Sequence, residues 1–398
     1  MTADPVSVPE AETFEAEVAG HRIEVIVDGD ARLERLLALL DGAARSIDMI
    51  MYIFEHDAAG SRVLDAMTAA ARRGVRVRAV IDCFGSADVA DSVFAPLREA
   101  GGSVSFFSRR WRSSYLIRNH QKLLLIDESV AVTGGFNIAE AYLGTRESHC
   151  WFDLAVLVQG PSVARLADWC DQMHDYSVNH DGKLLMLRRL IRDWPVDDGP
   201  VSWLVGGPTQ RLSPWARAVR SDLEKARRLD MAMAYFSPGQ GMLRRLGRVA
   251  SRGKARFVMA ARSDNPATIG ASRLLYGYLL RRKAAIWEYQ PCRLHMKLIV
   301  IDDTVYVGTA NFDMRSLFMN VELMLRIADA GFAQRMRDFV AGMKPDCEVV
   351  TLESHKARAS WLTRLRWTLA FFVVGVADYT VSRRLNFGLG EPDPEAEI

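Results

Sequence analysis

Two of the chain's 8 histidines head two copies of the same uncommon pattern. Each copy reads His-x-Lys, four apolar residues, Asp, five or six further residues and Gly-x-x-Asn. The residues in question are His120, Lys122, Asp127 and Asn137 in the first copy, and His295, Lys297, Asp302 and Asn311 in the second. Two imidazoles, two ammonium groups and two amides suggest one site built around a phosphate.

The four apolar residues after each lysine are typical of a buried strand. Because residues i and i+2 of a strand face the same way, His120 and Lys122 project together, as do His295 and Lys297. The aspartate of each copy has the opposite parity to its histidine, so it points away from the imidazole. We therefore interpret both aspartates as organising the turns into the following strands.

A glycine turn follows each strand, at Gly134-Gly135 and at Gly308-Thr309. Glycine permits tight turns and a close approach of the backbone. Amides at these turns, together with Asn137 and Asn311, can donate hydrogen bonds to anionic oxygens, and Thr309 adds a hydroxyl. One copy alone would be a weak signal, but two copies at matching places are a strong one.

The elements that position these motifs are themselves repeated. Residues 44–54 resemble residues 226–236, and each stretch is typical of a helix end followed by a buried strand. Residues 72–77 resemble residues 251–257, and both indicate a helix that ends at a glycine before a new strand. This alternation predicts an α/β fold with a mainly parallel sheet, duplicated as an α-β-α sandwich whose two pseudo-symmetric halves form one active site.

Composition shifts divide the chain into five parts. We expect a flexible acidic leader at 1–21, a first half at 22–182, a linker at 183–199, a second half at 200–353 and a C-terminal segment at 354–398. Within that last segment, residues 367–377 are apolar, which is too short for a helix to span a bilayer. Their aromatic and basic flanks predict a helix in the membrane interface, and the alternative is a buried helix that closes the core.

Charge and cysteine content limit the possible functions. With 51 basic and 49 acidic residues the net charge is +2, which argues against a generic nucleic-acid binder. The 5 cysteines are scattered and indicate free thiols in a reducing cytosol. A local basic run precedes the first motif and suits lipid phosphates, nucleic acid or a solvated loop. It comprises Arg109, Arg110, Arg112 and Arg118, with Trp111 and Tyr115.

Over residues 22–353 the chain resembles the phospholipase D superfamily with two His-Lys-Asp motifs, and within it the bacterial cardiolipin synthases. The narrower resemblance rests on the stretches 52–55 with Gly60, 134–139 with Tyr142, 151–153 with 160–161, and 311–316 with 320–322. With no pair of N-terminal transmembrane helices before the motifs, the chain is similar to the shorter synthases of the family.

The resemblance implies a phospho-histidine mechanism without a metal or other cofactor. It assigns His120 as the nucleophile and His295 as the acid and base, although the symmetry of the motifs leaves this order open. It implies that the non-bridging phosphate oxygens are bound by Lys122, Lys297, Asn137 and Asn311. Because the family motif includes Asp127 and Asp302, we keep them in the catalytic set. Asp153 and Glu322 match the acids that orient the two imidazoles in the family.

The function implied is that of a cardiolipin synthase, which makes cardiolipin and glycerol from two phosphatidylglycerol molecules. We expect it at the cytoplasmic side of the cell membrane, bound to the anionic surface, without nucleic acid and with no obligate protein partner to infer. Three alternatives remain: a phospholipase D that releases phosphatidic acid, a nuclease of the same superfamily, and a non-enzymatic membrane scaffold.

Overall fold

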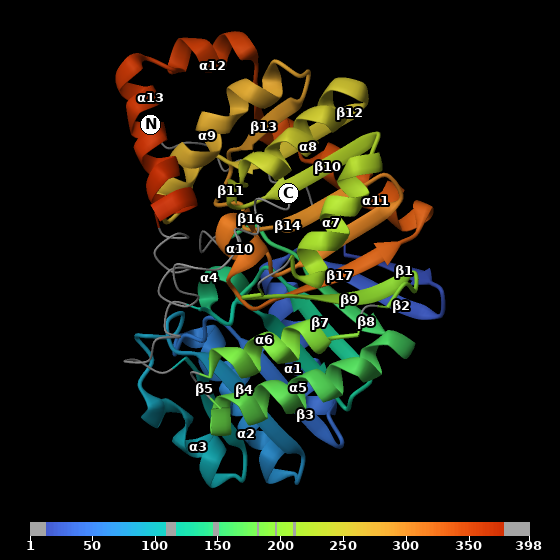
Figure 1. The fold of residues 1–398 in the computed structure, drawn as a ribbon. Coiled ribbons are helices and arrows are strands. Elements are labelled where there is room, and N and C mark those ends of the chain that lie inside the picture. The colour runs from blue at the N-terminus through green and yellow to red at the C-terminus, as the bar shows by residue number, and fades with distance from the viewer. Residues whose placement is uncertain are drawn as a thin grey trace.

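The computed structural model describes residues 13–108, 117–145, 151–180, 183–195, 197–209 and 212–377. Two eight-stranded sheets, each covered by helices, lie one above the other (Figure 1). Most of the basic run before the first motif lies outside the described residues, which include only its last member, Arg118.

The two sheets have the same strand order, apart from one extra edge strand each. The first sheet runs β1 (Phe14–Val18), β2 (His21–Ile26), β8 (Ala155–Gln159), β7 (Val130–Gly134), β6 (Lys122–Ile126), β3 (Ser46–Met51), β4 (Arg76–Asp82) and β5 (Ser103–Phe107). The second runs β9 (Val201–Gly206), β17 (Glu322–Ala328), β15 (Thr304–Gly308), β14 (Lys297–Ile301), β10 (Arg228–Met233), β12 (Lys254–Ala260), β13 (Ala285–Tyr289) and β18 (Cys347–Val350). The duplication seen in the sequence is therefore a duplication of the sheet.

The sheets are mixed rather than mainly parallel, which corrects our prediction. Within the two eight-stranded sheets, only β3-β4-β5 and β10-β12-β13 pair in parallel, and the other neighbours are antiparallel. The motif strands form hairpins, because the connections of three and two residues after β6 and β14 are too short for a parallel crossover.

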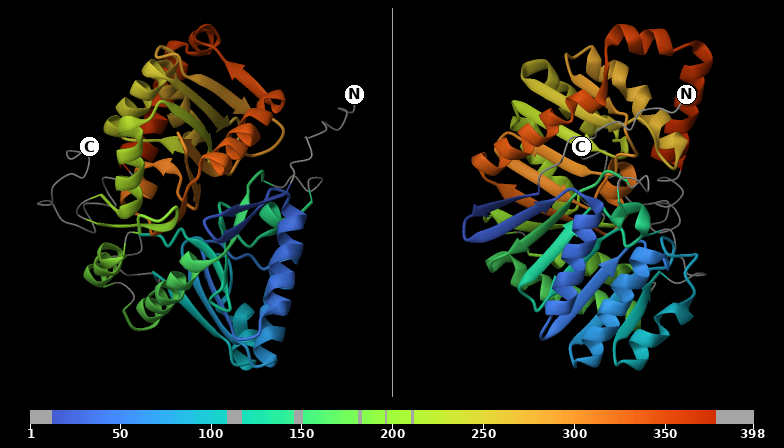
Figure 2. Two further views of the ribbon diagram at one scale, coloured as in Figure 1. Left: turned by 90° about the vertical axis from the view of Figure 1, so that its right-hand side faces the viewer. Right: turned by 180° about the vertical axis from the view of Figure 1, so that it is seen from behind.

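Helices cover both faces of each sheet, as the two turned views show (Figure 2). The first half contains α1 (Gly29–Gly42), α2 (Ala58–Arg72), α3 (Ala95–Glu99), α4 (Glu140–Leu143) and α5 (Arg165–Asp175), and α6 (Leu184–Asp193) follows. The second contains α7 (Pro214–Lys225), α8 (Gln240–Arg252), α9 (Pro266–Leu280), α10 (Met314–Phe318), α11 (Ala330–Gly342), α12 (Leu352–Arg358) and α13 (Trp361–Phe371). Covered on both faces, β6 and β14 are buried along their whole length, which explains their unbroken apolar runs.

One apolar core runs through both halves. It contains Leu123 and Trp169 on one face of the first sheet and continues to Trp215 and Leu298 in the second half. A separate cluster lies beneath α1 and α2 on the other face of the first sheet. The halves are therefore joined by buried apolar contact, which holds their strand ends in fixed positions.

Two predicted boundaries change in the structure. Part of the expected flexible leader is strand β1, which pairs with β2 because Phe14, Ala16 and Val18 alternate toward the protein. Part of the expected linker is helix α6, whose Leu187 and Ile191, one turn apart, are buried. Among the described residues, no helix has both the length and the apolar character needed to cross a membrane.

Gly60 in α2 provides a test of this packing. A Cβ atom there would collide with the backbone carbonyl of Glu55, whereas one at Gly42, at the end of α1, would meet no atom within 4 Å. We predict that Gly60→Ala lowers the free energy of unfolding by about 1–3 kcal/mol through overpacking. Gly42→Ala, the matched control, should not lower it, because alanine is favoured over glycine in a helix by up to about 1 kcal/mol. Equal melting curves for the two variants would contradict the described backbone.

Candidate active site

Each motif histidine lies where the two halves exchange backbone hydrogen bonds. The His120 backbone N–H donates to the Val321 carbonyl at 2.9 Å, and the His295 N–H donates to the Phe152 carbonyl at 2.8 Å. Short parallel bridges, Asn119 to Val321 and Phe152 to Leu294, mark the same two crossings. The segment that carries each histidine is thus held by a segment of the opposite half.

The two predicted orienting acids come directly after these crossing points. Glu322 follows Val321, and both its oxygens lie 3.0 Å from Nδ1 of His120. Asp153 follows Phe152, and its Oδ2 lies 2.7 Å from Nδ1 of His295. Each acid therefore contacts the histidine of the other half, and both carboxylates are fully buried.

Burial and the motif lysines keep both imidazoles neutral. Desolvation, reinforced by Lys122 and Lys297, lowers the pKa of His120 well below its usual value. Desolvation and Lys297 lower the pKa of His295 to about 3. A neutral imidazole whose Nδ1 faces a carboxylate carries its proton there, which leaves the lone pair on Nε2. That arrangement suits nucleophilic attack.

The two lysines lie against the histidines of their own motifs. Lys122 Nζ donates to the His120 carbonyl at 2.8 Å, and Lys297 Nζ lies 3.0 Å from Nε2 of His295. Desolvation lowers the pKa of Lys122 to about 7 and that of Lys297 to about 8. Each lysine also acts electrostatically on the histidine of the other half, so the two motifs form one site.

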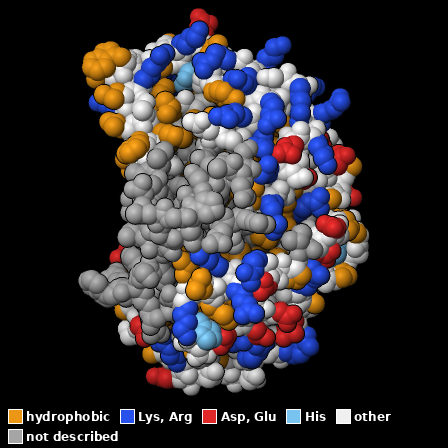
Figure 3. Space-filling model, viewed as in Figure 1, with side chains coloured by type: hydrophobic (Ala, Val, Ile, Leu, Met, Phe, Trp, Pro, Cys, Tyr) orange, Lys and Arg blue, Asp and Glu red, His pale blue; other side chains and the backbone are white. Residues whose placement is uncertain are grey.

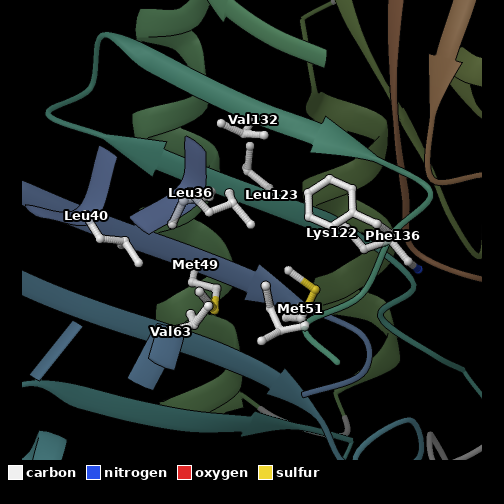
Figure 4. A pocket seen from close by; sticks show the side chains of 11 residues that line it. Leu36, Leu40, Met49, Met51, Val63, Lys122, Leu123, Val132 and Phe136 are labelled. Atoms are coloured by element: carbon white, nitrogen blue, oxygen red, sulfur yellow. The ribbon is translucent and has the colours of Figure 1, made fainter. Parts of the chain in front are cut away.

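The stem of Lys122 explains its desolvation. It borders an apolar cavity of about 10 Å³ between β3, β6, α1 and α2, where its neighbours include Met49, Met51 and Phe136. Figure 4 shows the nitrogen end of Lys122 pointing away from these side chains. The ammonium group thus reaches the site through an apolar layer, where a charge is costly without an anion nearby.

The glycine turns have different tasks in the two halves. A Cβ on Gly135 would lie 2.5 Å from Asp153 Oδ1 and 2.8 Å from the His295 carbonyl, so a glycine permits this approach. At the equivalent position, the Thr309 hydroxyl donates to Glu322 at 2.5 Å and accepts from the Leu323 N–H. The prediction that Thr309 binds phosphate is therefore corrected, since its hydroxyl positions Glu322.

The two motif asparagines also differ. Asn137 Oδ1 accepts from the Ile53 N–H at 3.2 Å, which fixes the Asn137 amide beside the segment that follows β3. Asn311 is buried, and its Oδ1 has no hydrogen-bond partner among the described residues. Because amide oxygen and nitrogen positions are assigned from their partners, this side chain is free to present its N–H₂ to an anion.

The motif aspartates lie at the far ends of their strands. Asp127 accepts hydrogen bonds from the backbone N–H groups of Ala44, Arg45 and Ser46. Asp302 does the same for Arg227 and Arg228. Each aspartate follows its histidine by seven residues, which is about 23 Å of extended chain, so neither carboxylate reaches the reacting groups. Their place in the catalytic set is corrected to a structural one, as the parity argument indicated.

Sequence reasoning missed several neighbours of the histidines. Tyr52 lies with its edge to His120 at 4.7 Å, and Trp151 stands edge-on to His295 at 5.0 Å. Asp82, which is fully buried, accepts from the Asn119 N–H at 2.7 Å and so holds the backbone just before His120. The sequence held one signal for two of these neighbours, because both copies read Arg-x-His-x-Lys with Arg118 and Arg293 in the first position. Arg118 acts electrostatically on Tyr52, and Arg293 lies over the Trp151 ring.

This fold and site define the chain as a duplicated phospholipase D-type protein. Residues 36–173 and 219–343 match the family described as "Cardiolipin synthase, PLD-like domain". The chain belongs to this family.

Similar proteins agree with this assignment. The chain is 28% identical to cardiolipin synthase B of Salmonella typhimurium, over 88% of this chain and 87% of that protein. It is 30% identical to the major cardiolipin synthase ClsA of Bacillus subtilis, over 85% of this chain and 72% of that protein. The phosphatidylserine synthase of Haemophilus influenzae shares the fold, with a TM-score of 0.71, 12% identity, and coverage of 95% of this chain and 97% of that one.

The lowered lysine pKa values predict how anion binding depends on pH. Below about pH 7 both ammonium groups are charged, and they lose their protons as the pH rises through about 7 and 8. Burial raises the pKa of Glu322 to about 7, so its ionisation above that pH opposes an anion as well. We predict that the affinity for dimethyl phosphate, measured by calorimetry, falls above pH 7. The fall is up to about tenfold per pH unit for each proton that these groups must take up when the anion binds.

Lys297→Gln provides the control. It should remove the step near pH 8 and retain the one near pH 7. An affinity that stays constant from pH 6 to pH 9 would contradict the assignment of the buried ammonium groups to the phosphate.

Proposed function

We propose that the protein is a cardiolipin synthase-type phosphatidyltransferase that acts on phosphatidylglycerol. The observation that carries the proposal is the pair of crossed imidazole–carboxylate contacts, His120 with Glu322 and His295 with Asp153, between two buried ammonium groups. Membership of the cardiolipin synthase family supports the lipid class of the substrate.

The first half-reaction transfers the phosphatidyl group to a histidine. Nε2 of His120 attacks the phosphorus of phosphatidylglycerol, and the bond from phosphorus to the glycerol oxygen breaks. The anionic phosphodiester raises the pKa of His295, whose imidazolium then protonates the leaving glycerol. Lys122, Lys297 and the Asn311 amide stabilise the charge on the non-bridging oxygens.

The second half-reaction returns the histidine to its starting state. A hydroxyl of a second phosphatidylglycerol gives its proton to His295 and attacks the phosphorus, and the bond from phosphorus to Nε2 of His120 breaks. The products of the cycle are one cardiolipin and one glycerol. If water enters in place of the second lipid, the same steps release phosphatidic acid.

In this cycle each histidine depends on the acid that it contacts from the other half. A phospho-histidine carries its phosphoryl group on Nε2 while Nδ1–H stays bound to the carboxylate, which stabilises the positive ring. The protein is proposed to work as a peripheral enzyme at the cytoplasmic face of the membrane, where both lipid substrates lie.

Purified protein mixed with phosphatidylglycerol vesicles tests this proposal. We predict equal amounts of cardiolipin and glycerol, measured by mass spectrometry and an enzymatic glycerol assay. His120→Ala should lower the rate at least about a thousandfold, because loss of a nucleophile leaves only the binding groups. His180→Ala, on the π-helix Tyr176–His180 outside the site, should retain the wild-type rate.

Two results would overturn the assignment. Phosphatidic acid as the sole lipid product would make the enzyme a hydrolase. Full turnover in His120→Ala would exclude the covalent route through that histidine.

A further inference from the structure

The C-terminal helix exposes an apolar face. Six large hydrophobic side chains on α13 and on the π-helix that follows it, Phe372–Ala377, are exposed to solvent. They are Trp361, Leu362, Leu365, Leu369, Phe372 and Val373, here called the C-terminal ridge. In Figure 3 hydrophobic side chains gather at the upper left edge of the molecule, where Figure 1 places α13. Apolar patches of this kind mark interaction surfaces.

The ridge is fixed in orientation by the opposite face of the same helix. Ala370 packs so closely on α9 that a Cβ at Gly270 would lie 3.0 Å from the Ala370 Cβ. The Trp367 ring stacks on His355 at 5.4 Å. Residues three, four and seven apart share one helix face, so Leu362, Leu365 and Leu369 point outward together. The fold partly covers one face of α13 and leaves a second apolar face uncovered.

The charges beside the ridge suit an anionic surface. Residues 360–377 contain no aspartate or glutamate, and Arg364 and Arg366 are exposed next to the ridge. An exposed apolar face with flanking arginines is typical of a helix that lies in the membrane interface, where the arginines meet lipid phosphates. An anionic bilayer would repel acidic residues here, whereas contact with another protein does not require a segment without them.

The position of the ridge also favours a lipid surface. The π-helix at its C-terminal end packs against α10, which begins three residues after Asn311 of the second motif. A bilayer that meets the ridge therefore lies beside the part of the second half that carries the site. Lipid substrates would have a short path from the surface to the histidines.

We propose that the C-terminal ridge docks the protein on an anionic bilayer, with Trp361, Leu365, Leu369 and Phe372 in the headgroup region and Arg364 and Arg366 on lipid phosphates. This extends the proposed function but does not depend on its chemistry, since docking is measured without turnover. It develops the first expectation for this segment, a helix in the membrane interface, over the alternative of a buried helix that closes the core, since α13, together with the π-helix after it, leaves six large hydrophobic side chains exposed.

Flotation with vesicles tests the docking surface. Full-length protein is mixed with vesicles of phosphatidylglycerol and phosphatidylethanolamine, and the bound fraction is measured against lipid concentration. The triple variant Leu365→Ser, Leu369→Ser, Phe372→Ser should bind at least about tenfold more weakly, because three apolar side chains no longer enter the interface. Arg364→Gln with Arg366→Gln should reduce affinity for these vesicles roughly fivefold per arginine, and not for phosphatidylcholine vesicles.

Matched controls separate docking from folding and from active-site binding. Leu185→Ser with Val349→Ser removes two exposed hydrophobic side chains outside the ridge, 78% and 47% exposed, and should bind as the wild type does. His120→Ala should also bind normally. Unchanged melting temperature and unchanged binding of dimethyl phosphate show that the triple variant is folded.

Two outcomes would overturn the proposal. The first is wild-type flotation of the triple variant. The second is a concentration-dependent dimer in analytical ultracentrifugation that the triple variant abolishes, which would assign the ridge to a second copy of the chain.

Discussion

The site depends on two buried hydrogen bonds between imidazole and carboxylate, each made across the boundary between the halves. Glu322 holds His120 and Asp153 holds His295, and the backbone next to each acid also binds the backbone of the histidine that it orients. Neither half contains a complete histidine–acid pair. The apolar core that joins the halves is therefore a requirement of the chemistry as well as of the fold.

The same arrangement places two ammonium groups in a buried environment, where desolvation opposes their charge. Lys122 and Lys297 are buried beside neutral imidazoles, and their lowered pKa values record the cost of desolvation. The carboxylates of Glu322 and Asp153 offset part of that cost, and an anionic phosphodiester adds further negative charge beside the two ammonium groups. Thr309 and Asp82 support this region, since Thr309 binds Glu322 and Asp82 binds the backbone before His120. Substrate binding would thus offset free energy of folding that the buried charges cost.

Local sequence pattern predicted what depends on neighbours along the chain. Strand periodicity placed His120 beside Lys122 and turned Asp127 away, and the repeat predicted two equivalent halves. The local pattern did not predict side-chain contacts between segments that are distant in the sequence. The spacing gives no indication that Glu322 crosses to His120 or that the Thr309 hydroxyl contacts an acid instead of phosphate. The mixed pairing of the sheets could have been predicted from the sequence, because the short turns after the motif strands require antiparallel hairpins.

Nitrogen-15 resonances of the two histidine rings test the crossed pairing most directly. In protein labelled at histidine, Glu322→Gln should shift the ring nitrogens of His120, and Asp153→Asn should shift those of His295, because each variant replaces the anionic acceptor of one Nδ1–H with a neutral amide. His120→Ala and His295→Ala assign the two sets of resonances. We predict that each acid perturbs only the histidine of the opposite half. If Glu322→Gln instead shifts His295 and leaves His120 unchanged, the composite site described for this protein is wrong.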